Sequence, residues 1–197
     1  GYKFHSYTRR NGLTSDNVRL IFQASDKTLW VATDEGVCYF NGIDFVKVSL
    51  SDSLDEDRIR SIHEDDNGKI WVGSDHGISF IHAQNKCADT TLDFKQNFSD
   101  STVRCLTWYQ NKMWIGTDSG LYWYDKQNGL ALFPLQNNLC SWRILEVFPD
   151  SKGNVWVGTS AGVNKVSDST VSVFTTNDGL INNRVRSIAE DQYGNIW

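Results

Sequence analysis

The sequence predicts an all-β fold built from one four-stranded antiparallel unit that is repeated along the chain. The first observation is the segment WVGSDHGI at 71–78, because near-copies of it begin at three other tryptophans. The second is the period, since the steps between successive anchor tryptophans are 41, 43, 42 and 41 residues. A fixed period of this size is the sequence signature of a repeat architecture. The anchors are Trp30, Trp71, Trp114, Trp156 and Trp197.

The composition of the 197-residue chain is that of a globular protein. With 40% hydrophobic and 13% aromatic residues, it has more apolar side chains than a disordered segment. The formal net charge of −5, with acidic and basic residues interspersed, does not provide the basic face that nucleic-acid binding requires. No apolar run approaches the roughly 18 residues that span a bilayer. We therefore expect no contact of this segment with nucleic acid or with a membrane.

Each period contains four short strand signals. In the first, 18–22 is an apolar run, and 29–33 and 37–40 are rich in residues that favour strands. The Asn41-Gly42 pair is a strong hairpin signal, and it precedes a fourth strand at 43–48. The fourth strands of the later periods are weaker and are expected at 92–94, 131–135 and 171–175.

A four-stranded unit of this size cannot bury both of its faces, and radial stacking of such units produces a β-propeller. A solenoid is the alternative, but hairpin turns between four strands fit a propeller blade better. Each anchor tryptophan would bury about 150 to 250 Å² between blades, which is worth at most about 4 to 6 kcal/mol. The predicted organisation is an outer strand of a preceding or closing blade at 1–11, blades at 12–52, 53–96, 97–137 and 138–178, and the start of a fifth blade at 179–197.

Two further positions recur in register. A glycine six residues after each complete anchor suits a loop residue with positive φ or a closely packed backbone. Four of the five apolar inner runs have arginine as their second residue, and we expect these arginines to pair with loop aspartates between blades. The glycines are Gly36, Gly77, Gly120 and Gly162, the arginines are Arg19, Arg60, Arg104 and Arg186, and the aspartates are Asp34, Asp75 and Asp118.

The consensus of these copies resembles the two-component regulator propeller repeat. The segment 179–197 has its Gly-Leu, polar connector, Val-Arg-x-Ile, acidic turn with Gly-Asn, and Ile-Trp, and 12–36 is a second close copy. The resemblance implies two seven-bladed propellers in the periplasmic sensor half of a membrane-bound hybrid histidine kinase that senses glycan fragments, typical of gut Bacteroidetes. It also implies an immunoglobulin-like domain, a transmembrane helix, a kinase core and often a DNA-binding output domain, none of which this sequence contains.

The repeats amount to about four and a half blades, which is an incomplete ring. An open arc leaves two apolar blade faces uncovered, and this favours association. We therefore expect one of three arrangements. The chain self-associates, for example as two arcs that close one ring; or 2–7 pairs with the strands of 185–197; or the remaining blades of a longer chain complete the propeller.

Candidate ligand-binding residues lie just before the inner strands, on the face where propellers commonly bind ligands. The position two residues before the strand is small and polar in four copies and is Trp142 in the fourth. An exposed indole there could stack on a sugar ring, with the neighbouring Arg143 bonding hydroxyls or a carboxylate. Two alternatives are that Trp142 fills a packing gap and that the arginines are solvated rather than a rim for an acidic oligosaccharide. The candidates are Trp142, Arg143, Arg58, Arg184, Asp16 and Asn17.

The sequence predicts no catalytic residues, no metal site and no cofactor. The histidines fall at unrelated repeat positions, and the acidic clusters belong to the recurring hairpin turn. The cysteines lack the spacing of metal ligands, so buried free thiols are the default, with a disulfide as an option in an oxidising compartment. These residues are His5, His63, His76 and His82, and Cys38, Cys87, Cys105 and Cys140.

The expected function is that of a non-enzymatic, periplasmic sensor segment, with an oligosaccharide as its ligand and a kinase elsewhere as its output. A propeller lyase or glycosidase is one alternative, but it would need convergent carboxylates or a histidine on the binding face. A protein-interaction scaffold is the other alternative, since propellers host many functions.

Overall fold

The computed structural model of the chain describes residues 4–50, 57–82, 84–88, 101–167 and 169–197. The strand expected at 92–94 lies outside these residues. The chain forms two compact units, Gly1–Asp100 and Ser101–Trp197, which are described one at a time. No helix among the described residues is both long and apolar enough to cross a membrane.

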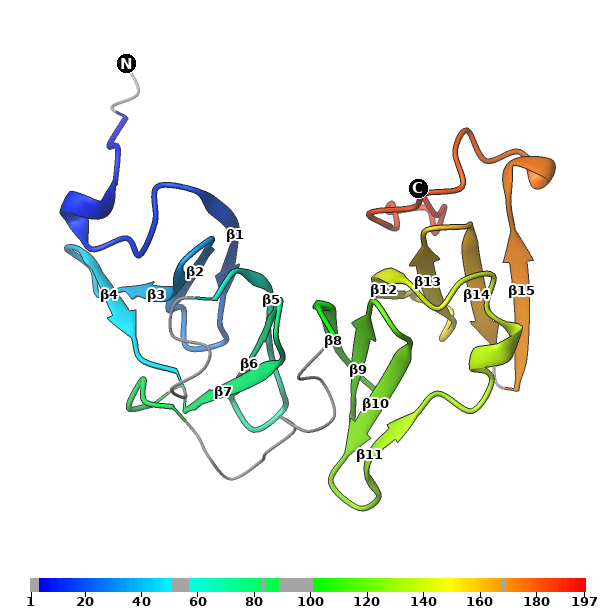
Figure 1. The fold of residues 1–197 in the computed structure, drawn as a ribbon, viewed down its shortest axis with the longest axis horizontal. Helices are drawn as coiled ribbons and strands as arrows, with labels where there is room; N and C mark the ends of the chain where they lie inside the picture. Colours follow the sequence, from blue (N-terminus) through cyan, green and yellow to red (C-terminus); the bar gives the residue numbers. More distant parts are fainter. Residues whose placement is uncertain (1–3, 51–56, 83, 89–100, 168) are drawn as a thin grey trace. The chain divides into compact units, whose positions relative to one another are not determined.

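The first unit contains two antiparallel sheets (Figure 1). One has four strands in the order β1-β2-β3-β4, and the described part of the other has three in the order β5-β6-β7. Strands that are consecutive in the sequence are neighbours in each sheet, as expected for a propeller blade. The strands are β1 (Val18–Gln23), β2 (Leu29–Thr33), β3 (Gly36–Phe40), β4 (Phe45–Val48), β5 (Ile59–Glu64), β6 (Lys69–Ser74) and β7 (Ile78–His82).

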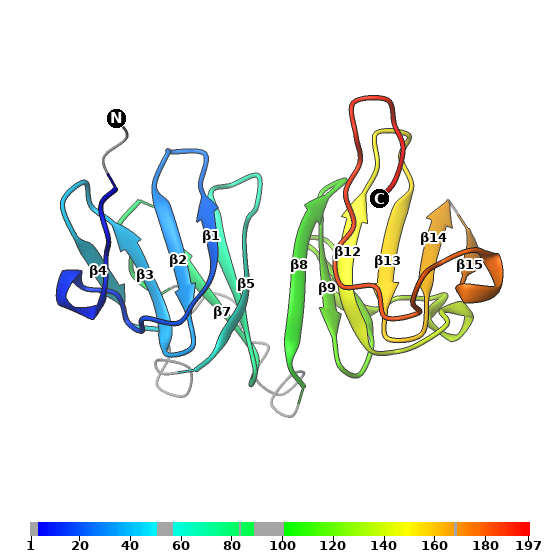
Figure 2. The ribbon, with the colours of Figure 1, turned by 90° about the horizontal axis from the view of Figure 1, so that it is seen from above.

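The second unit contains two four-stranded antiparallel sheets, again with sequential strand order. Figure 2 shows the strands of each sheet side by side, with the C-terminal segment beside β12 and β13. The strands are β8 (Val103–Tyr109), β9 (Lys112–Thr117), β10 (Leu121–Asp125), β11 (Gly129–Leu132), β12 (Ile144–Pro149), β13 (Val155–Thr159), β14 (Val163–Ser167) and β15 (Thr170–Phe174).

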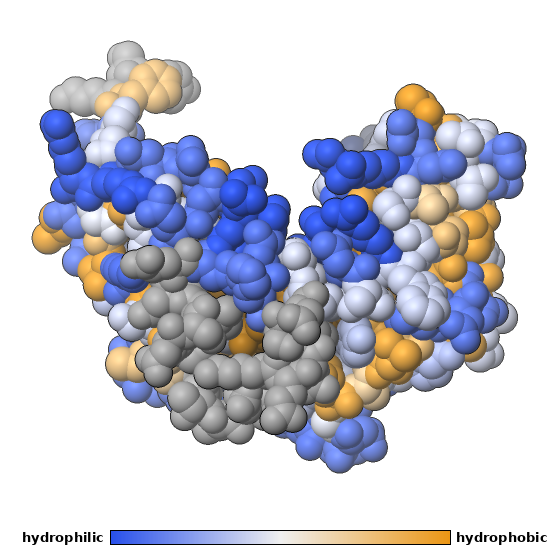
Figure 3. Space-filling model, viewed as in Figure 1, coloured by the Kyte–Doolittle hydropathy of each residue, from blue (hydrophilic) through white to orange (hydrophobic). Residues whose placement is uncertain are grey.

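Trp30 and Trp114 lie where one sheet packs on the next, whereas Trp197 is 76% exposed, contrary to the expectation that every anchor is buried between blades. In the first unit, Trp30 of β2 is fully buried in a cluster with Ile59 and Ile70 of the following sheet. In the second, Trp114 packs in a cluster with Ile144 and other apolar residues of the following sheet. Hydrophilic and hydrophobic side chains both occur on the visible surface of each unit (Figure 3). The predicted all-β architecture of stacked four-stranded blades is therefore confirmed.

The loop glycines have the backbone that the sequence predicts. Gly36, Gly77, Gly120 and Gly162 have φ values of 104°, 148°, 157° and 147°. The carbonyl of each accepts a hydrogen bond from the hydroxyl of the residue three positions earlier, at 2.8 to 3.2 Å. The left-handed residue therefore closes the same hydroxyl-capped loop in all four blades.

Two predicted strands are not formed by the described residues. Residues 4–8 lie in no strand, and instead the ring of Tyr7 packs edge-on against Phe40 and Phe45, at 5.6 and 5.4 Å between centroids. At the other end, the run 185–188 is not a strand, and an isolated bridge from Glu190 to Ile196 is the one pairing of the last hairpin. A hairpin without a third strand has too few ladder partners to form a regular sheet.

Candidate functional site

The site begins with a β-bulge at the second residue of each inner strand. In all four sheets the register between the first two strands shifts there, for example between Val18 and Leu20. A bulged residue is left out of the ladder, and its side chain is re-aimed. The bulged residues are Arg19, Arg60, Arg104 and Leu145.

Each bulged arginine binds the aspartate that follows the second strand of its own blade. Arg19 Nε lies 2.5 Å from Asp34 Oδ1. The guanidinium of Arg60 makes two bonds to Asp75, at 2.6 and 2.9 Å. Arg104 makes the same two bonds to Asp118, with Nη2 at 2.7 Å from Oδ2. The predicted pairing is correct, but it occurs within a blade and not between blades, because the bulge points the arginine along its own sheet.

A second arginine, from the connector before the next inner strand, joins two of these aspartates. Arg58 Nε lies 3.0 Å from Asp34 Oδ1, and Arg143 Nε lies 2.9 Å from Asp118 Oδ1. The pKa of Asp34 is lowered mainly by its hydrogen bond from Arg19, and that of Asp118 mainly by its hydrogen bond from Arg104. The two carboxylates therefore stay ionised and link adjacent blades, so the structure holds Arg58 and Arg143 in ion pairs.

Asp16 and Asn17 shape the connector of the first blade. Asp16 Oδ1 accepts a hydrogen bond from the Arg9 backbone at 2.8 Å. The Asn17 carbonyl accepts one from the Asp34 backbone at 3.2 Å. Both contacts position the chain, and the side chain of Asn17 also bonds Asp34 and helps to lower the pKa of that carboxyl.

The fourth blade departs from this pattern. Leu145 occupies the place of the bulged arginine, and Ser160 occupies the place of the aspartate. Ser160 Oγ lies 2.9 Å from Ser141 Oγ, next to Trp142, whose side chain is 54% exposed. The Val185 backbone donates to the Thr159 carbonyl at 3.0 Å, which brings Arg184 beside Ser160. Trp142, Ser160 and Arg184 therefore lie on one rim of the second unit.

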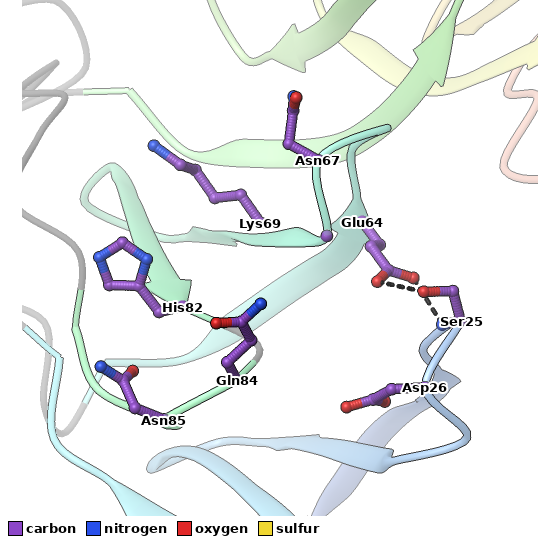
Figure 4. A pocket seen from close by; sticks show the side chains of 9 residues that line it. Ser25, Asp26, Glu64, Asn67, Lys69, His82, Gln84 and Asn85 are labelled. Atoms are coloured by element: carbon purple, nitrogen blue, oxygen red, sulfur yellow. Dashed lines mark hydrogen bonds between the residues drawn. The ribbon is translucent and has the colours of Figure 1, made fainter.

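A different cavity lies at the hairpin-turn end of the first unit. It measures about 520 Å³, and Figure 4 shows Ser25 and Asp26 opposite Lys69, His82 and the amides of Gln84 and Asn85. The Glu64 carboxylate accepts from the Ser25 backbone at 2.6 Å and from its hydroxyl at 2.8 Å. The Asp26 carboxylate binds Lys86 Nζ at 2.8 Å. Both acids therefore clamp neighbouring turns, a structural role that depends on contacts between blades.

The turn acids also hold the anchor tryptophans. Asp65 Oδ2 accepts from Trp71 Nε1 at 3.2 Å, while Oδ1 accepts from turn amides. Asp150 and Asp191 make the same contact with Trp156 and Trp197, at 2.8 and 3.0 Å. The first and third copies have Ala24 and Tyr109 at this position, and there the buried Nε1 atoms of Trp30 and Trp114 have no hydrogen-bond partner among the described residues.

Histidines and cysteines form no reactive cluster in the described part of the chain. His76 Nδ1 lies 2.9 Å from Asp57 Oδ1 on the connector, a contact that the scattered histidine spacing did not predict. No group of three potential metal ligands occurs among the residues described. Cys38, Cys87, Cys105 and Cys140 are free; Cys87 is exposed, which departs from the expectation of buried thiols because it follows a turn at the outer edge of β7.

The stacked four-stranded sheets define a segment of a β-propeller, and solved structures share this fold. The extracellular domain of a hybrid two-component system from B. thetaiotaomicron is 28% identical, with a TM-score of 0.81, covering 94% of this chain and 26% of that chain. That of a second such system from B. thetaiotaomicron is 22% identical, with a TM-score of 0.73, covering 92% and 26%. A streptogramin B lyase is 16% identical, with a TM-score of 0.68, covering 91% and 61%.

The family model described as "Two component regulator propeller" matches residues 12–35, 53–76 and 179–197. Repeats of this type therefore occur at three places in the chain. It spans about a quarter of the length of the extracellular domains that it matches. No protein with a curated description matches it.

Proposed function

We infer that the chain is part of the ligand-binding region of a hybrid two-component sensor, on the periplasmic side of the membrane, and that it binds glycan-derived oligosaccharides. The observation that carries this inference is the 28% identity and TM-score of 0.81 with the extracellular domain of a hybrid two-component system. In this proposal a kinase outside the segment reads the bound state.

The rim of the second unit has the groups that a sugar ligand needs. Trp142 offers an exposed ring face for stacking, since sugar rings present C–H groups to aromatic faces while their hydroxyls seek polar partners. The hydroxyls of Ser141 and Ser160 are both donors and acceptors, and their mutual bond of 2.9 Å holds them beside the indole. These groups favour an oligosaccharide over an apolar ligand.

Binding without catalysis fits the arrangement of the acids. Glycoside hydrolysis needs a pair of carboxyl groups that face one scissile bond. Asp34 and Asp118 are held by arginines, and Glu64 clamps a turn. The streptogramin B lyase shares the fold at 16% identity, which is no basis for carrying its activity to this chain.

Isothermal titration of the 197-residue chain with a panel of oligosaccharides tests the proposal. We expect one class to bind and Trp142→Ala to weaken that binding at least tenfold. Tyr193→Ala is the matched control, because Tyr193 is also exposed but lies in a hairpin turn away from Trp142. The proposal fails if no oligosaccharide binds, or if the two variants lose affinity equally.

A further inference from the structure

We propose that the rim between the fourth blade and the following segment binds the carboxylate of an acidic oligosaccharide, with Arg184 as its guanidinium partner. This inference rests on the proposed function and specifies its ligand class. The ligand carboxylate would occupy the place that an aspartate side chain fills in the other three blades.

Comparison of the blades shows what is missing at this rim. The first three blades each have an acid at the position four residues after the anchor, and the fourth blade has Ser160. Where an arginine follows in the next connector, as at Arg58 and Arg143, it binds that acid at 3.0 and 2.9 Å. Arg184 holds the same connector position, but Ser160 stands where the acid would be.

The guanidinium of Arg184 is free in the described part of the chain. Its side chain is exposed, and no carboxylate of the described residues lies within ion-pair distance of it. Arg143, the neighbouring candidate, is already paired with Asp118. Of the three connector arginines that the sequence singles out, Arg184 is therefore the one available to an outside anion.

The backbone fixes this arginine next to the other binding groups. The bond from the Val185 amide to the Thr159 carbonyl, at 3.0 Å, sets residue 184 beside Ser160. The Ser160 hydroxyl in turn bonds Ser141, which precedes Trp142. A sugar stacked on the indole would therefore have a hydroxyl pair and a guanidinium within the span of the same rim.

The chemistry selects a planar oxyanion on a sugar. Arginine donates in a fork geometry that matches a carboxylate with two parallel bonds. A serine hydroxyl can donate a further hydrogen bond to the same group. The first and third blades show that a connector arginine binds a carboxylate at this place, because Arg58 binds Asp34 and Arg143 binds Asp118. In the fourth blade Leu145 replaces the bulged arginine, so Arg184 would be the one arginine of the repeat that binds the ligand there.

The experiment compares three trimers by titration into the 197-residue chain: galacturonate, neutral galactose and sulfated galactose. We expect the galacturonate trimer to bind at least tenfold more tightly than the neutral trimer. Arg184→Gln should remove this preference, so that the variant binds the acidic and the neutral trimer with equal affinity. Arg58→Gln is the matched control, because Arg58 has the same repeat position but already has its acid.

A second variant restores the missing acid. Ser160→Asp should abolish the preference for galacturonate and raise the melting temperature, and the rise should disappear when Arg184→Gln is added. Equal affinity for the acidic and neutral trimers refutes this inference but leaves the proposed function intact. Tighter binding of the sulfated trimer than of galacturonate also overturns it, and binding of no trimer refutes both.

Discussion

Replacing Glu146 with glutamine should remove a pH-dependent loss of stability from the second unit. Glu146 pairs with Gly158 in the ladder between β12 and β13, on the side covered by Val185. A Cβ built on Gly158 would lie 3.0 Å from the Val185 carbonyl oxygen and 3.4 Å from Glu146 Cβ. The equivalent positions in the other sheets are neutral, namely Leu20, Ser61 and Cys105.

Burial raises the pKa of Glu146 from 4.5 to about 7. Because the folded state holds its proton more tightly than the unfolded state, the contribution to stability is complete below pH 4.5 and is lost as the pH rises through 7. At about 1.4 kcal/mol for each pH unit between the two pKa values, the loss is at most about 3 kcal/mol. Glutamine cannot ionise, so the variant should not lose this stability as the pH rises.

The assay is urea unfolding of both proteins at intervals from pH 5 to pH 8. The difference between the two free energies of unfolding should be smallest at pH 5 and largest at pH 8, where the variant should be the more stable. The aspartates with lowered pKa values titrate below this window, and any effect of His63, whose pKa is lowered by burial, cancels in the difference between the two proteins. Parallel curves for the two proteins across the whole range would refute the reasoning.

Two further predictions concern the anchors and the exposed blade face. Ala24→Asp should stabilise the first unit by about 1 kcal/mol in urea unfolding, because it supplies the acceptor that Trp30 Nε1 lacks. Conversely, Asp65→Ala should lower the free energy of unfolding by about 1 to 3 kcal/mol, because it removes the acceptor of Trp71 Nε1. A lower free energy of unfolding in Ala24→Asp would contradict this account. Light scattering should give a mass above the 22.4 kDa of one chain, because Ile21 on β1 is 66% exposed and offers an apolar surface for self-association. The variant Ile21→Lys should have a mass of 22.4 kDa. A monomer at all concentrations would contradict self-association.

Local features of the fold could be predicted from the sequence because each depends on a few consecutive residues. The strands around Trp30 and Trp71 and the positive φ of Gly36 follow from the period, the turn residues and the strand-forming composition. The strand expected at 2–7 is not formed by residues 4–7, because alternation of aromatic and polar residues does not supply a ladder partner. Tyr7 instead covers the rings of the first blade.

The candidate site was only partly predictable, for a reason that lies in the ladder register. The exposure of Trp142 could be expected from a single tryptophan among polar equivalents. The bulge decides whether Arg19 binds Asp34 within a blade or between blades. A bulge could not be predicted, because the pattern of apolar residues does not show where the ladder register shifts. The second role of Asp34, which also binds Arg58, depends on how blades stack.

The departures from the repeat at Ala24, Tyr109 and Ser160 are of two kinds with different consequences, and burial decides between them. At Ala24 and Tyr109 the missing acid leaves the buried indole N–H of Trp30 or Trp114 without a hydrogen-bond partner in the described part of the chain, and because the N–H is buried, water cannot replace the acid. At Ser160 the missing acid leaves Arg184 exposed, where water solvates the charge at little cost. An unpaired guanidinium on the surface is therefore compatible with a stable fold, and it stays available to a ligand that supplies the carboxylate.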